Sequence, residues 1–350
     1  MRIRRSLPIV LSVIAVAAVL TLLVQLRKHA PPEPARLLPG ADGFFYLNLQ
    51  WLRRANLTGN LPPVSHDPEY EQFIQATGFQ FERDLDEAAF AIHYAPAAPA
   101  QLDQARFSEV FIGRIDGERL NAYLRKLSGE VEDYRSVSVY NIPLEGRRLR
   151  VAVLGVDTVA ASNNSDPGVI RGMIDRSRKL ASPFGGPQFL RQYYREVPLA
   201  SVSWAILKLN PNGQAAGGPF DLAFLFPQPA VVVASIRYLG SVHFRAEAFS
   251  DSGEDAQRLT EKVGTYLSLF HAAEISVGSQ GPDPDVKQFF DSLKVEQHGD
   301  RAVLNAVIPA GFLRKAIAES PHEFESPETP PPSPQPTAPK PRAPATVRRR

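Results

Sequence analysis

The feature that most constrains this chain is a predominantly apolar segment near its start, residues 7–26, which has no charged residue and only three polar ones, Ser12, Thr21 and Gln25. A helix of these twenty residues is about 30 Å long, the thickness of a bilayer's hydrocarbon core. A cleaved signal peptide is the alternative, but its apolar region is normally about 7–15 residues long. Here the run is longer, and cleavage after its small-x-small match at Ala15-Val16-Ala17 would leave an apolar end exposed. We therefore expect an uncleaved transmembrane signal anchor at 7–26.

The charges that flank this segment predict its orientation. Three arginines precede the segment and two basic residues follow it: Arg2, Arg4, Arg5, Arg27 and Lys28. The bias favours a cytoplasmic N-terminus at residues 1–6 and a body outside the cytoplasm. The absence of cysteine agrees with that location and excludes both disulfides and thiolate zinc sites. We expect a single-pass protein of the cell membrane with an extracytoplasmic, periplasmic body.

Changes in composition divide the rest of the chain. Residues 27–36 form a proline-rich linker, and the long middle section is predicted as two α+β subdomains at 37–200 and 201–319. Ten of the 32 prolines lie in 320–350, which has almost no large apolar residues and ends in arginines. Such a segment cannot bury enough apolar surface to order, so we expect a disordered, basic, proline-rich tail.

Hydrophobic periodicity in the body predicts alternating strands and helices. An order of strand, helix, strand pair and helix occurs twice, which favours an α+β fold with antiparallel sheets covered by helices. A duplicated β-α-β-β-α unit is one interpretation of this order, and the alternative is that any α+β chain contains such runs. We expect strands at 42–49, 88–94, 109–115, 136–142, 148–153, 158–162, 201–209, 230–238, 241–249, 293–297 and 302–308, and helices at 68–77, 118–127, 166–180, 188–195, 252–270, 285–293 and 309–317.

Two of these helices carry clear signals. In the first, Asp67 can cap the N-terminus, Pro68 suits the first helical position and Gly78 ends the helix. The second helix places its large apolar side chains on one face: Leu120, Tyr123, Leu124 and Leu127.

Motifs for catalysis or cofactor binding are missing from the sequence. The net charge of +2 argues against a nucleic-acid-binding protein. The chain has no GxSxG nucleophile elbow, no phosphate-binding GxxxxGK[ST] or GxGxxG loop and no HExxH. We therefore assign no catalytic, cofactor-binding or metal residue and expect no cofactor. Carboxylates paired only in space would escape such a search.

A few weaker candidates remain. His66-Asp67-x-Glu69 has ligand-like residues, but Asp67 is already explained as a helix cap. The acids of Glu82–Glu87 lack the order of an EF-hand and are interpreted as a solvated loop. His93 and His243 lie in strand patterns, where a lone histidine is more often a structural residue than a ligand.

The start of the body resembles a group of uncharacterised bacterial single-pass membrane proteins. The similarity lies in an LP-x-A-D-x-x-x-Y-L-x-L stretch and in residues 84–88 before a strand. The residues that match the stretch are Leu38, Pro39, Ala41, Asp42, Tyr46, Leu47 and Leu49. This resemblance implies a repeated α+β extracytoplasmic domain behind an N-terminal anchor, and it implies no activity.

Three functions are compatible with these features. The first is an anchored extracytoplasmic binding or scaffold protein of the bacterial envelope, without enzymatic activity. The second is an anchored hydrolase whose site forms only in three dimensions. The third is the inverted topology, with a cytoplasmic body and a proline-rich interaction tail. The expected partners are the lipid bilayer through Leu7 to Leu26, and an envelope protein or an anionic surface through the tail, with no nucleic acid.

Overall fold

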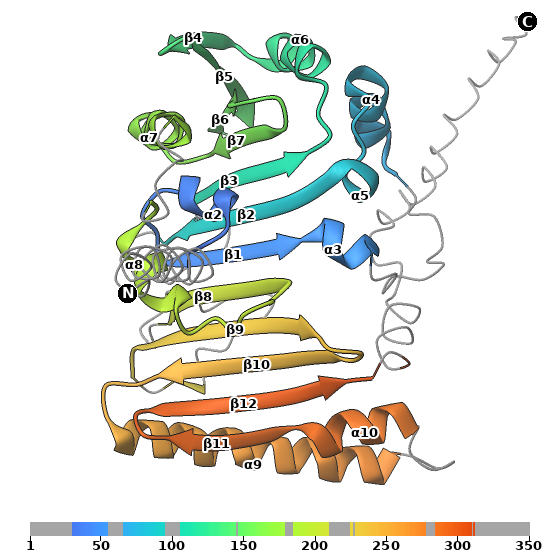
Figure 1. Cartoon of the computed structure of the whole chain (residues 1–350), viewed down its shortest axis with the longest axis vertical. Helices are drawn as coiled ribbons and strands as arrows, with labels where there is room; N and C mark the ends of the chain where they lie inside the picture. The colour runs from blue at the N-terminus through green and yellow to red at the C-terminus, as the bar shows by residue number, and fades with distance from the viewer. Residues whose placement is uncertain are drawn as a thin grey trace, which may run out of the picture.

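A single antiparallel sheet of twelve strands forms the centre of the computed structural model (Figure 1). The strand order is β11-β12-β10-β9-β8-β1-β2-β3-β7-β6-β5-β4, and each neighbouring pair is antiparallel. The structure describes residues 30–54, 66–94, 106–144, 146–178, 185–209, 225–226, 228–277, 284–309 and 311, with the backbone alone for 270–277.

The strands follow the expected positions closely, with one addition, β4. They are β1 Gly43–Asn48, β2 Leu85–His93, β3 Arg106–Gly113, β4 Glu130–Tyr134, β5 Val137–Leu144, β6 Arg147–Val153, β7 Thr158–Ser162, β8 Ser203–Leu209, β9 Ala230–Tyr238, β10 Val242–Phe249, β11 Lys294–His298 and β12 Arg301–Ile308.

The helices of the described residues are mostly short. They are α2 Glu33–Leu37, α3 Leu49–Arg54, α4 Pro68–Thr77, α5 Phe81–Asp84, α6 Gly117–Leu127, α7 Gly168–Ser177, α8 Gln188–Tyr194, α9 Gly253–Val277 and α10 Pro284–Ser292. The expected helix at 309–317 and the tail at 320–350 lie outside the described residues, apart from Pro309 and Gly311.

The predicted fold class is wrong. The expectation was several antiparallel sheets, with a repeated β-α-β-β-α unit as one interpretation, but the described strands form one β-rich sheet. The order of elements also differs between the two halves, since β3-α6-β4-β5-β6-β7-α7 is not matched by β9-β10-α9-α10-β11-β12. The halves join because β1 pairs with both β2 and β8, and periodicity along the chain carries no information about such pairing. The domain boundary expected between residues 200 and 201 falls just before β8 and stays a prediction.

The expected transmembrane helix is likewise corrected. Within the described ranges, no helix is both long enough and apolar enough to cross a bilayer. The segment on which that expectation was based, residues 7–26, lies outside them.

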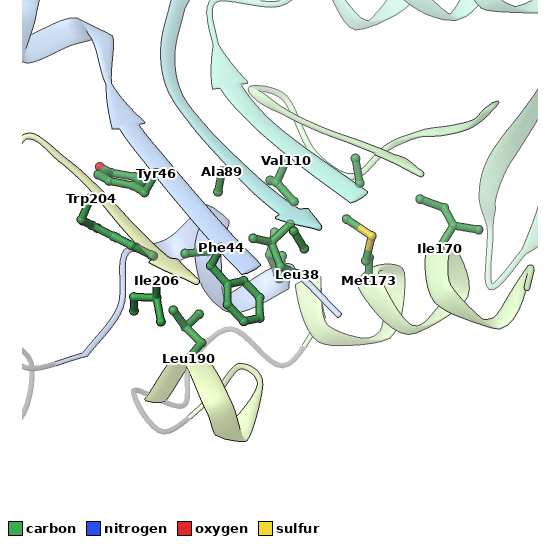
Figure 2. Packing of buried hydrophobic residues seen from close by; sticks show 14 of the residues in the cluster. Leu38, Phe44, Tyr46, Ala89, Val110, Ile170, Met173, Leu190, Trp204 and Ile206 are labelled. Atoms are coloured by element: carbon green, nitrogen blue, oxygen red, sulfur yellow. The ribbon is translucent and has the colours of Figure 1, made fainter. Parts of the chain in front are cut away.

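The two faces of the sheet are covered differently. We call the face that carries Val110 the α7 face, because α2, α7 and α8 pack there around Phe44, Met173 and Leu190 (Figure 2). Small residues such as Ala89 and Ala160 lie beside Val110 in the register, so the helices approach closely. This layer holds the largest buried cluster of the described residues.

The opposite side, which we call the α6 face, carries alternate residues of the same strands. Helices α4, α5 and α6 cover it over β3, β6 and β7. At the other end of the sheet, Leu259 of α9 packs on Ala248 and Ala302 of the same face. The candidate site lies under the first of these covers.

Candidate functional site

An apolar pocket lies between the α6 face of the sheet and the helices α4 and α6. Its volume is about 230 Å³. An apolar cavity of about 150 Å³ is large enough to bind benzene, so this pocket fits a larger ring or a short chain. Its walls are Phe73, Thr77, Phe79, Phe81, Glu109, Phe111, Ile115, Asp116, Leu120, Leu124, Leu149, Val151, Val159 and Ala161.

The floor of the pocket is made by side chains in register on three strands. Glu109 of β3 lies opposite Ala161 of β7, which lies opposite Val151 of β6. Phe111 and Val159 form the next row on the same face. Alternation along each strand sends these side chains to one side of the sheet, where the small Ala161 leaves room above it.

The helical walls form for the reasons that the sequence indicates. Asp116 caps α6 by accepting hydrogen bonds from the N–H groups of Glu118 and Arg119, both at 3.1 Å. Leu120 and Leu124, one turn apart, then face the sheet and are buried.

Helix α4 is fixed at both ends. Asp67 accepts a 2.7 Å hydrogen bond from the Tyr70 N–H, and Gly78 ends the helix in the left-handed region with φ of 72°. This geometry directs Phe73 and Thr77 toward the pocket. The expected helix at 68–77, with its cap and its terminal glycine, is confirmed.

Aromatic rings form the rim. Phe81 stacks on Phe73 with ring centroids 5.7 Å apart and planes at 12°, and Phe79 meets Phe81 edge-on at 5.3 Å. The Phe81 N–H donates to the Tyr70 hydroxyl at 2.8 Å, which holds the rim to α4. Phe81 is 40% exposed, so it lies at the mouth of the pocket.

Asp84 fixes the turn that carries this rim. Its buried carboxylate accepts hydrogen bonds from the Gln80 N–H at 3.0 Å and from Arg83, and it forms an ion pair with Arg114 at 3.0 Å. The hydrogen bond from Arg83 is the main cause that lowers the pKa of Asp84. The sequence expectation of a solvated loop was wrong here, because α5 and Asp84 are packed against the end of β3.

Three polar side chains line the apolar pocket, and two have partners. Thr77 donates to the Phe73 carbonyl at 2.7 Å, and Asp116 is the α6 cap. Glu109 makes no hydrogen bond or ion pair with any described residue. Burial among Phe90, Phe111 and Ala161 raises the pKa of its carboxyl.

The histidine and the acids that the sequence offers as candidates do not form one cluster in the structure. His66 pairs with Glu71 at 2.8 Å and Glu82 at 3.5 Å, while Asp67 remains the helix cap. The other acids contact separate partners: Asp84 with Arg83 and Arg114, Asp86 with Arg53, and Glu87 with Tyr46. No group of three or more potential metal ligands occurs in the described part of the chain.

A partly buried serine–histidine pair lies on the α7 face. Ser108 Oγ lies 3.4 Å from His93 Nε2, and burial lowers the pKa of His93. Ser108 is 0% exposed and also contacts Ser162 Oγ at 2.9 Å. A nucleophile must reach its substrate, so this pair fits a structural role. His243 contacts Ser241 Oγ at 3.1 Å on another strand.

The fold and the pocket define a β-rich protein with a single antiparallel sheet and an apolar cavity under helices. No family model matches the chain, and no curated protein matches it. The resemblance to uncharacterised membrane proteins therefore stays a prediction.

Solved structures give only a distant likeness. Crystal form IV of TP0453 has a TM-score of 0.40 at 12% identity and covers 81% of this chain and 96% of its own. Crystal form III has a TM-score of 0.38 at 12% identity, with 82% and 98% covered. Similarity at this level carries no conclusion about this protein.

Proposed function

We propose that this protein is a binding protein whose ligand is a small molecule with an apolar body and one hydrogen-bonding group. The observation that carries the proposal is the apolar pocket of about 230 Å³, whose walls are almost entirely aliphatic and aromatic. Ligand sites typically combine such walls with very few polar groups.

The size of the pocket sets the expected affinity. Each buried methylene contributes about 0.8 kcal/mol, so a six-carbon chain gains roughly 5 kcal/mol. Part of this gain is offset by the loss of translational and rotational freedom on association. The net gain is therefore smaller than this, and we expect dissociation constants of about 1 mM or higher for simple chains. A tighter natural ligand would have a better-fitting shape and a polar group that reaches Glu109.

Glu109 gives the pocket its polarity. A protonated carboxyl both donates and accepts, and an ionised carboxyl only accepts. A hydroxyl group satisfies either form, because it can donate and accept. An apolar molecule with a terminal hydroxyl group is therefore the ligand class with the best complementarity.

Binding is favoured over hydrolysis by the groups that surround the pocket. Asp116 Oδ1 accepts the two α6 cap hydrogen bonds and Oδ2 pairs with Arg119 at 3.4 Å, which leaves Glu109 without a second available carboxylate among the described residues of the pocket wall. Among the described residues, neither serine nor histidine lines this pocket. The general acid and base of a glycosidase, or the nucleophile and base of an esterase, would need such a pair.

A series of straight-chain alcohols tests the proposal. Isothermal titration calorimetry would measure the affinity of the protein for each alcohol from butanol to decanol. Affinity should rise with each added methylene and then level off once the pocket is full. Absence of saturable binding across the series, or an increase that never levels off, would contradict an apolar site of limited size.

A further inference from the structure

A second pocket, on the α7 face, is lined by arginines rather than by apolar side chains. We call it the arginine pocket: Arg106, Arg147, Arg148 and Arg150, Gly146 and the loop residues 163–165 surround a volume of about 340 Å³. We propose that the arginine pocket binds a phosphate group.

Two of its arginines are held in place by neutral partners. Arg150, only 8% exposed, donates to the Asn164 carbonyl at 2.6 Å and to the Ser165 carbonyl at 3.4 Å. Arg106 donates to the Asn163 carbonyl at 3.3 Å. Carbonyl partners fix the two guanidinium groups and leave their positive charge uncompensated.

The described part of the pocket wall offers no carboxylate to balance this charge. Among the described residues that line the arginine pocket there is no aspartate or glutamate. A buried charged group is normally paired, so a guanidinium held by carbonyls alone creates a favourable place for an anion.

The loop amides add further donors. The Asn163 side-chain oxygen accepts from the Phe107 N–H at 2.6 Å, and the Asn164 side-chain oxygen accepts from the Asp166 N–H at 3.1 Å. Because both side-chain oxygens already accept hydrogen bonds, the side-chain NH₂ groups of Asn163 and Asn164 are available as donors. The pocket therefore presents guanidinium and amide donors together.

The loop that carries these donors is anchored to the sheet. Ser162 Oγ contacts Ser108 Oγ at 2.9 Å and accepts from the Asn164 N–H at 3.2 Å. Binding would require little rearrangement of this loop, which favours affinity because few groups must be ordered on binding.

Phosphate fits this donor set better than a carboxylate does. A carboxylate offers two oxygens in one plane, whereas phosphate presents oxygens in several directions and suits arginines from different strands. Arg106 comes from β3, and Arg148 and Arg150 come from β6. The phosphate could belong to a soluble molecule or to a lipid headgroup, since both present the same group.

This site is separate from the apolar pocket. Arg150 and Val151 are consecutive on β6, so their side chains point to opposite faces of the sheet. One small ligand cannot occupy both pockets, and the phosphate proposal stands whether or not the apolar pocket binds a ligand.

The experiment compares Arg148→Gln and Arg106→Gln with Arg125→Gln in the full chain. Arg148 is exposed, so its substitution leaves the fold intact, and Arg125 is an exposed arginine of α6 outside the pocket. Calorimetry with inorganic phosphate forms one arm. Co-sedimentation with phosphatidylcholine vesicles, with and without phosphatidic acid, forms the other.

We expect saturable binding in at least one arm, with a dissociation constant raised about tenfold by either pocket substitution and unchanged by Arg125→Gln. Binding should weaken as salt increases. Phosphate binding alone would identify a soluble ligand, and binding to phosphatidic acid vesicles alone would identify a lipid headgroup. Failure in both arms, or equal effects of Arg148→Gln and Arg125→Gln, would overturn the proposal.

Discussion

The hydroxyl groups of Ser108 and Ser162 lie 2.9 Å apart across β3 and β7, buried on the α7 face. One residue further along β3, Glu109 points to the opposite face and lies beside Ala161. A single step along the strand therefore separates the anchored loop of the arginine pocket from the floor of the apolar pocket. Both pockets depend on the register of the same strands, because a shift of one residue would exchange the faces.

Replacement of Glu109 by glutamine should stabilise the protein at neutral pH. The folded state raises the pKa of Glu109, so ionisation costs stability as pH rises above the unfolded value of about 4.3. Glutamine has no such cost, and we expect a gain on the order of 1 kcal/mol in the free energy of unfolding at pH 7. Urea denaturation at several pH values measures this gain.

The pH dependence provides the control for this prediction. Below pH ~4 the side chain at position 109 is uncharged in both the unmodified protein and Glu109→Gln. The difference between their free energies of unfolding should therefore shrink toward zero. Glu130→Gln, on the exposed strand β4, should change stability by less than about 0.5 kcal/mol at either pH. A Glu109→Gln effect that is constant with pH would show that ionisation is not its cause.

Substitution of Gly113 by alanine should destabilise the rim of the apolar pocket. A Cβ at this position would lie 2.4 Å from the Asp84 carbonyl oxygen, so the backbone of β3 or α5 must shift. We expect a loss of about 1–3 kcal/mol, as for other overpacked sites. Gly117→Ala is the matched control, because a Cβ there meets nothing within 4 Å. Equal melting temperatures for the two variants would refute this close approach.

Asp84→Asn should weaken the fold at neutral pH and much less in acid. The lowered pKa of Asp84 means that its stabilisation is complete above the unfolded pKa of about 3.9 and disappears as pH falls through the folded value. Loss of the charge-assisted contacts with Arg83 and Arg114 should cost about 2 kcal/mol at pH 7. Chemical denaturation at pH 7 and pH ~2 checks both parts.

An exposed acid supplies the comparison for Asp84. Asp251 is exposed and lies outside the helices and strands, so Asp251→Asn should leave the free energy of unfolding unchanged at both values of pH. If Asp84→Asn resembles Asp251→Asn at pH 7, the carboxylate of Asp84 does not fix the α5 turn.

Local structure was largely predictable from the sequence. The cap at Asp67, the glycine at position 78 and the Leu120/Leu124 spacing place α4 and α6 correctly. Strand β4 was missed because Glu130–Tyr134 lies at the sheet edge and lacks apolar alternation. Helix α5 is not predicted because its four residues are too few to show a helical pattern of apolar side chains.

Pairing and the two pockets were not predictable. The contact of β1 with β8 joins residues about 160 positions apart, and no local pattern specifies it. The sequence places Glu109 only within a strand, because the burial that leaves its carboxyl without a partner depends on Phe90 and Ala161 from other strands. For the arginine pocket, the available signal in the sequence is the spacing of Arg148 and Arg150, which places both side chains on one face of a strand. This spacing does not indicate that the loop at 163–165 lies beside them.

The most direct test of the apolar pocket is the chain length at which alcohol affinity stops increasing. Ala161→Leu fills part of the cavity from the floor, and Ala122→Leu makes the same change on the exposed side of α6. Calorimetry should show that affinity levels off at a shorter alcohol in Ala161→Leu, while Ala122→Leu matches the unmodified protein. The same limiting chain length in all three proteins would show that the alcohols bind elsewhere and would contradict the proposed function.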